Sequence, residues 1–131
     1  MSRIIRIIII LTVFSLLCSG CATERPKSSL DLNKLNWGLE AQIALEKAQE
    51  VYQQAKNGGQ DLTNGPCLSN ALHGNADYPE TMWVLDIAHN PREAVDNQPE
   101  NQCLAFREGK AENFIELDPN GQLIKVYSPY L

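Results

Sequence analysis

The clearest strand pattern in the chain is the run Thr81-Met82-Trp83-Val84-Leu85-Asp86-Ile87-Ala88-His89. Its side chains alternate between two faces, with Trp83, Leu85, Ile87 and His89 on one face and Met82, Val84, Asp86 and Ala88 on the other. Such a period of two, rich in apolar and aromatic residues, is typical of a β-strand. We therefore expect this run to lie in a sheet, and we interpret the neighbouring segments around it.

Four other segments after Gly65 are interpreted as strands, at residues 67–69, 103–107, 113–117 and 123–127. The last two are joined by Asp118-Pro119-Asn120-Gly121, which suits a type I turn at each position. Glu108-Gly109-Lys110 is expected to form a tight connection between the strands at 103–107 and 113–117. The sequence thus predicts successive antiparallel strands.

A helix is predicted before the strands, from about Asn36 to Asn57. Apolar residues recur there at helical spacing within one arc of about 120° at roughly 100° per residue: Trp37, Ala41, Ala44, Leu45, Ala48, Val51, Tyr52 and Ala55. Gly58-Gly59 follows and favours a left-handed stop at the carboxyl end. The small side chains of this stripe predict that the helix lies closely on a sheet.

Together these elements predict the α+β class, with one N-terminal helix packed on a four- to five-stranded antiparallel sheet. The order of elements resembles that of cystatin-like rolls, a likeness of architecture that implies no activity. Residues 37–131 are expected to form this domain, because a chain of 131 residues is too short to form two well-packed hydrophobic cores.

The first 20 residues have the pattern of an export signal. Arg3 and Arg6 precede the uncharged apolar run 7–17, and the small residues Ser19 and Gly20 follow. A retained membrane-spanning helix is the alternative, but it needs about 20 apolar residues. Cys18-Ser19-Gly20-Cys21 resembles the lipobox of bacterial lipoproteins, except that the family prefers leucine where Cys18 stands.

The resemblance to bacterial lipoproteins implies that the leader is cut away and that Cys21 carries acyl chains, which anchor the protein to a membrane. Ala22 after the modified cysteine implies the outer membrane, facing the periplasm, in a Gram-negative cell. Polar residues and Pro26 make 21–36 a candidate tether. An ordinary secreted protein with a cysteine near its cleavage site is the alternative.

The charge balance disfavours nucleic acid as a partner. Two of the 11 Lys and Arg residues lie in the leader, so the remainder carries nine against 16 Asp and Glu residues. Binding to nucleic acid depends on cations that displace counterions from phosphate, and this chain has a surplus of acid. The expected partners are the membrane, through the lipid on Cys21, and an envelope protein.

Cysteine usage agrees with export. With Cys18 in the leader and Cys21 lipidated, Cys67 and Cys103 remain, and an oxidising compartment would join them in a disulfide. The alternative is a zinc site formed by Cys67, His73, His89 and Cys103. Their spacing lacks the close ligand pairs of structural zinc sites, so we predict neither a metal nor another cofactor.

The candidate site is the end of the central strand and the long connection after it. This stretch holds His89, Arg92 and Asp96, with Asp86 just before them. A histidine oriented by Asp86 or Asp96, with Arg92 to hold a carboxylate, could transfer protons. A solvated loop is the simpler interpretation, because no nucleophile, phosphate-binding loop or metal-binding motif stands at a diagnostic spacing.

Three functions stay open. The favoured one is a non-enzymatic binding or adaptor module. An exposed apolar patch built from Leu39, Ile43 or Met82 would favour it. The second is a small envelope enzyme that uses His89, and a carboxylate within hydrogen-bond reach of its ring would favour it. The third is an inhibitor or small-ligand binder, suggested by the roll-like order of elements.

Overall fold

The computed structural model describes residues 36–131. The predicted signal, Cys21 and the tether up to residue 35 lie outside the described residues. The elements are the helix α2 (Trp37–Asn57), the strands β1 (Cys67–His73), β2 (Trp83–Ile87), β3 (Asn113–Leu117) and β4 (Leu123–Tyr127), the short helix α3 (Leu104–Arg107), and the 3₁₀ turns η2 (Pro79–Thr81) and η3 (Ala94–Asn97). The α+β class is confirmed.

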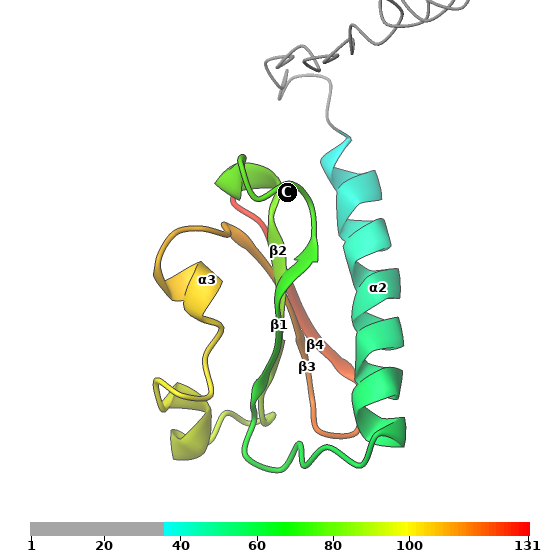
Figure 1. The fold of residues 1–131 in the computed structure, drawn as a ribbon, viewed down its shortest axis with the longest axis vertical. Helices are drawn as coiled ribbons and strands as arrows, with labels where there is room; N and C mark the ends of the chain where they lie inside the picture. Colours follow the sequence, from blue (N-terminus) through cyan, green and yellow to red (C-terminus); the bar gives the residue numbers. More distant parts are fainter. Residues whose placement is uncertain (1–35) are drawn as a thin grey trace, which may run out of the picture. The chain divides into compact units, whose positions relative to one another are not determined.

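The sheet has four strands in the order β1-β2-β3-β4, and it is mixed (Figure 1). β1 pairs with β2 and β3 with β4 in antiparallel fashion, whereas β2 and β3 run parallel. The prediction of a fully antiparallel sheet is therefore wrong at its centre. The predicted hairpin of β3 and β4 is confirmed, and Gly121 N donates to Asp118 O at 2.8 Å to close its turn.

Parallel pairing also explains why the prediction of a strand at 103–107 is wrong. Neighbouring parallel strands need a crossover of a dozen or more residues, because the chain must return to the starting edge before the second strand. The segment between Ile87 and Asn113 provides this crossover, and it contains η3 and α3. The long connection after β2 is thus a requirement of the topology.

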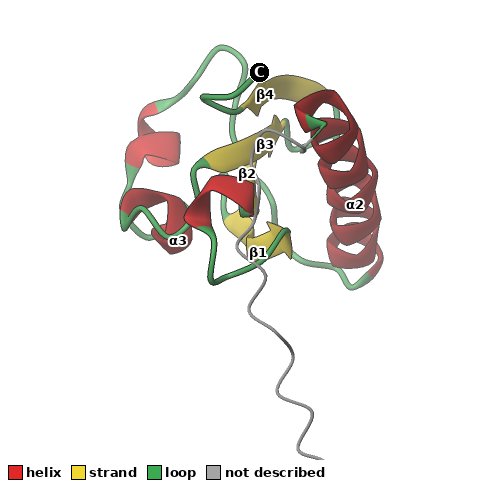
Figure 2. Cartoon of the chain, turned by 90° about the horizontal axis from the view of Figure 1, so that it is seen from above, coloured by secondary structure: helices red, strands yellow, loops and turns green. Residues whose placement is uncertain are grey.

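The helix α2 covers one face of the sheet, as Figure 2 shows. Asn36 caps its start by accepting a hydrogen bond from Leu39 N at 3.3 Å. The predicted alanine stripe meets the sheet, where Ala44, Ala48 and Tyr52 are buried. The strands contribute the inward residues of the same core: Leu72, Trp83, Leu85, Ile87, Ile115 and Leu117.

The crossover lies against the opposite face of the sheet (Figure 2). A second, smaller core there consists of Met82, Val84, Cys103 and Ala111. The predicted disulfide is present between Cys67 on β1 and Cys103 at the start of α3. It fastens the crossover to the edge of the sheet. Within residues 36–131, no helix combines the length and the apolar character that crossing a bilayer requires.

Candidate functional site

A groove of about 440 Å³ lies between the crossover and the second face of the sheet. Its walls are Val84, Asp86, Arg92, Gln102, Cys103, Phe106, Arg107, Phe114 and Glu116. This volume is within the range of small-molecule sites, roughly 300–1,000 Å³. The groove combines aromatic walls with a few charged groups, as such sites usually do.

Two carboxylates stand side by side in the groove. Asp86 on β2 and Glu116 on β3 are direct partners in the register of the parallel pair. In-register residues of neighbouring strands project from the same face, about 4.8 Å apart at the backbone. Burial, and next the charge of Glu116, raise the pKa of Asp86 to about 7, although Arg92 acts in the opposite direction. Asp86 is thus a carboxylate whose charge is poorly compensated by the protein.

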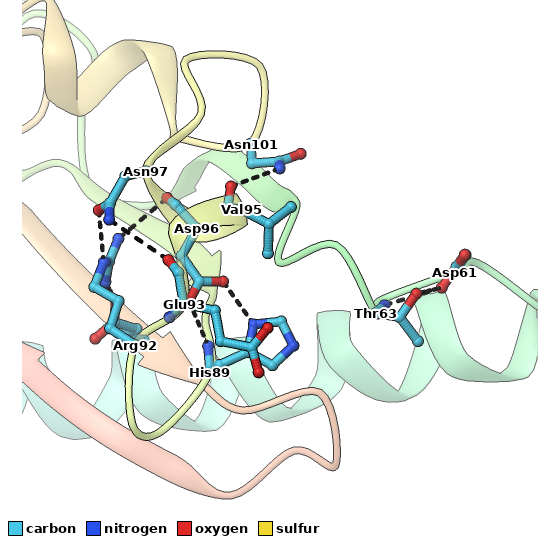
Figure 3. A network of polar contacts seen from close by, with 10 residues as sticks. Asp61, Thr63, His89, Arg92, Glu93, Val95, Asp96, Asn97 and Asn101 are labelled. Atoms are coloured by element: carbon cyan, nitrogen blue, oxygen red, sulfur yellow. Dashed lines mark hydrogen bonds and ion pairs between the residues drawn. The ribbon is translucent and has the colours of Figure 1, made fainter.

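Arg92 is engaged by Glu116 rather than by Asp86. Its Nη1 donates to Glu116 Oε1 in an ion pair. Its other donors are held by the loop, with Nε 3.0 Å from Asn97 Oδ1 and Nη2 3.3 Å from Asp96 O (Figure 3). The guanidinium is therefore fixed from two sides, and it neutralises Glu116.

The apolar wall of the groove is aromatic. Phe106 on α3 meets the ring of Phe114 edge to face at 5.1 Å, and Phe114 stacks on Tyr127 of β4 at 5.0 Å. Lys125 Nζ lies over both of the latter rings, 5.5 Å from the centroid of Phe114 and 5.3 Å from that of Tyr127. Phe106 remains 37% exposed, so part of this aromatic surface is open to a ligand.

Arg107 is the second cation of the groove. Its Nη1 donates to the Pro99 carbonyl at 3.2 Å. Among residues 36–131 it forms no ion pair with a carboxylate, and its side chain is exposed at the rim. Its charge is available to the solvent or to a ligand.

His89 lies beyond the end of β2, in a separate polar cluster with Asp96 (Figure 3). Its Nδ1 is 2.8 Å from Asp96 Oδ1, while Asp96 Oδ2 accepts hydrogen bonds from the backbone N of His89 at 3.0 Å and of Glu93 at 2.7 Å. Asp96 is only 1% exposed. The carboxylate thus ties the start of the crossover to the end of β2.

The environments of this pair shift both groups toward their charged forms. Burial alone would raise the pKa of Asp96, but the hydrogen bonds from Glu93 and His89 together keep that pKa below its ordinary value. The hydrogen bond with Asp96 raises the pKa of His89, against a smaller effect of burial. A buried carboxylate that accepts several hydrogen bonds is a structural anchor as well as an orienting group for the imidazole.

The hollow beside His89 measures about 320 Å³ and lies at the carboxyl ends of β2 and β3. Thr63 is the hydroxyl residue of its wall, and its Oγ1 donates to Asp61 Oδ1 at 2.6 Å. The wall otherwise consists of His89, Asn90, Pro91, Glu93, Asp118, Pro119 and Asn120. The histidine is oriented, but this wall offers it no free nucleophile to activate.

The structure therefore divides the predicted site residues between two places. It brings His89 together with Asp96, as one of the two predicted pairings required. It places Asp86 and Arg92 in the groove instead, where Arg92 meets Glu116. The two places are linked through the residue Asp96, whose side chain holds His89 and whose carbonyl accepts from Arg92.

Sequence reasoning missed Glu116, Phe106, Phe114 and Arg107. The alternation of residues 113–117 did place Phe114 and Glu116 on one face, opposite Ile115 and Leu117. What was lacking was the parallel register that sets Glu116 beside Asp86. The length of the connection after β2 is the signal that could have indicated it.

Cys67 and Cys103 are joined to each other, His73 Nε2 pairs with Glu40 at 2.7 Å, and His89 pairs with Asp96. In the described part of the chain, no three His, Cys, Asp or Glu side chains gather as a metal site would need. Of the three residues expected in an apolar patch, Leu39 is 49% exposed, Ile43 is half-buried and Met82 is buried.

Comparisons of the chain with protein-family models, curated proteins and solved structures found no match.

Proposed function

We propose that this chain is a lipid-anchored binding protein of the bacterial cell envelope and that the groove beside Asp86 holds its ligand. The anchor is supported by the resemblance of residues 1–21 to a lipoprotein signal, which would attach the chain to a membrane through Cys21. The outer membrane, facing the periplasm, is the proposed location in a Gram-negative cell. The groove supplies the binding site.

The main support for a binding role is the partly buried carboxylate of Asp86, which lies beside Glu116. A partly buried carboxylate beside a second carboxylate costs stability, because its charge is poorly solvated. Arg92, the cation that could relieve it, is paired with Glu116. Poorly compensated charges of this kind gather at functional sites, where a ligand completes them.

A second candidate function is proton transfer by His89, favoured by its 2.8 Å contact with Asp96. The same contact is fully explained by the anchoring role of Asp96. Because this structural role accounts for the contact, we place the binding function first.

The binding function can be tested on the full chain purified from membranes in mild detergent. Native mass spectrometry should detect a small molecule that leaves when the protein is denatured. Gln102→Trp, which fills the groove, should remove this molecule, whereas Asn120→Trp beside His89 should not. Retention of the molecule by the Gln102 variant would exclude the groove as its site.

The anchor needs a separate test, since the two parts of the proposal can fail independently. Intact-mass measurement of the same sample should show loss of residues 1–20 and an acyl mass on Cys21, and Cys21→Ser should release the chain from membranes. An unprocessed N-terminus would contradict the anchor and leave the groove assignment in place.

A further inference from the structure

We propose that the groove binds a small zwitterion, with its ammonium group at Asp86, its carboxylate at Arg107 and its apolar body on Phe106 and Phe114. This inference rests on the proposed binding function and adds the chemical class of the ligand. Free amino acids and short peptides both have this chemistry.

The charged side chains inside the groove are only partly paired with one another. Four charged side chains line it, two acidic and two basic. The ion pair of Arg92 with Glu116 uses one of each sign, and the loop contacts of Arg92 hold that pair in place. One carboxylate, Asp86, and one guanidinium, Arg107, are left without an opposite charge of their own.

The two remaining charged groups differ in their burial. Asp86 is half-buried on β2 and accepts a backbone hydrogen bond from Ile87. The Cys103 Sγ that lies 4.0 Å from its Oδ1 carries no hydrogen in the disulfide to donate. Arg107 stands at the end of α3, exposed at the rim. A ligand would thus bring its ammonium group inward and its carboxylate outward. A ligand with a single charge would leave one of the two groups unmatched.

The same groove also has an aromatic wall. Phe106 and Phe114 both line the groove, and Lys125 already places its ammonium group over Phe114 and Tyr127. Aromatic faces accept both apolar groups and cations. The wall therefore suits an apolar body that carries an ammonium group, and an amino acid with an aromatic side chain is the best matched probe.

The test uses the full chain in detergent micelles and isothermal titration with four probes. Phenylalanine and alanyl-phenylalanine keep both charges, N-acetylphenylalanine lacks the ammonium group, and phenylalanine amide lacks the carboxylate. We expect each loss of a charge to weaken binding by tenfold or more. The tighter of the two zwitterions distinguishes a free amino acid from a short peptide as the source.

Variants assign each charge to its residue. Asp86→Asn should weaken the zwitterions at least tenfold and leave N-acetylphenylalanine unchanged, since that probe has no ammonium group to lose. Arg107→Gln should weaken the zwitterions and leave phenylalanine amide unchanged. Asp77→Asn and Lys47→Gln, both exposed and outside the groove walls, are the matched controls and should bind like the wild type. The melting temperature of each variant verifies that it is folded.

The outcomes separate this inference from the binding function. Equal affinity for the charged and the blocked probes would overturn the zwitterion. If neither zwitterion binds but a co-purified molecule still depends on the groove, the zwitterion proposal is also overturned. In that case the binding function stands. If no probe binds and no molecule co-purifies, both proposals fall.

Discussion

At the scale of single residues, Asp86 is a carboxylate whose charge the protein compensates poorly. A carboxylate on a central strand, beside another carboxylate and with a pKa of about 7, weakens the fold at neutral pH. In the folded state the pKa of Asp86 lies above its ordinary value, so the protonated carboxyl contributes its full stability to the fold at low pH. That contribution is lost as the pH rises toward and through 7.

Replacement of Asp86 by asparagine should therefore stabilise the protein. Asn keeps the shape of the side chain and removes the charge, so the gain should be about 1–2 kcal/mol at pH 8. The gain should shrink at pH 5, where the wild-type carboxyl is protonated when folded. Thermal unfolding at the two pH values measures this, with Asp77→Asn as the exposed control. A variant less stable than the wild type at pH 8 would mean that Asp86 has a structural role.

Asp96 should behave in the opposite way. Asp96→Asn removes an acceptor that serves three donors in the interior, and we expect a loss of about 2–4 kcal/mol. Because the pKa of Asp96 is lowered in the folded state, Asp96 stabilises the fold at pH values above 3.8, its unfolded pKa. Because the pKa of His89 is raised, His89 stabilises the fold at pH values below 6.5, its unfolded pKa.

The loss in the Asp96 variant should thus be largest between about pH 4.5 and 6.5 and smaller at pH 9. Denaturant unfolding across this range is the measurement. Glu100→Gln in the same connection is exposed and should be neutral throughout. A loss independent of pH would show that the pairing with His89 contributes nothing.

At the scale of elements, the β3–β4 hairpin is held against α2 by hydrogen bonds from Gln49 and Tyr52, and the contact with Tyr52 is the shorter. Tyr52 OH donates to the Pro119 carbonyl at 3.1 Å, and Gly121 has a positive φ of 85° beside the Tyr52 ring. A Cβ on Gly121 would lie 2.4 Å from Tyr52 Cε1. Glycine is thus required at this turn for two reasons, backbone conformation and space.

Gly121→Ala should cost about 2–4 kcal/mol, the sum of a left-handed alanine and a displaced ring. Gly59→Ala is a well-matched control, because its φ of 73° is also positive but nothing lies within 4 Å of the added carbon. It should cost only the conformational part, about 1–2 kcal/mol. Equal losses in thermal unfolding would show that the tyrosine ring moves aside freely.

The disulfide between Cys67 and Cys103 links the crossover to the sheet. Cys67 and Cys103 are 36 positions apart, and closing such a loop is worth roughly 4 kcal/mol in the chain-entropy model. Cys67→Ala should lower the melting temperature markedly, and the reduced wild type should match it. Because Cys103 also lines the groove, binding should weaken as well. An unchanged melting temperature would contradict the stabilising role.

Much of this element structure could be predicted from local pattern. The stripe from Trp37 to Ala55 and the turn at Asp118-Pro119-Asn120-Gly121 depend on neighbouring residues, and both predictions are confirmed. The segment 103–107 could not be predicted in this way. Its short apolar run fits a strand or a helix, and only the parallel pairing of β2 with β3 decides for α3.

The same reason limits what the sequence tells about the site at the scale of the whole molecule. The pair of His89 and Asp96 is local and could be foreseen as one of two possibilities. The groove joins Asp86, Phe106 and Glu116 from three separate segments, and their meeting depends on the register of the sheet and the path of the crossover. The mixed topology thus creates the site, since the connection it requires forms one wall.

The protein compensates the charge of Asp86 poorly, because burial and Glu116 outweigh Arg92 and the backbone hydrogen bond from Ile87. Carbon-13 NMR of the full chain, freed of bound molecules, measures the titration of the Asp86 carboxyl directly. The Asp86→Asn variant assigns its signal. We predict a titration midpoint of about 7 for Asp86. A midpoint near the ordinary value of 3.8 would show that the charge is already compensated and would contradict the groove as a ligand site.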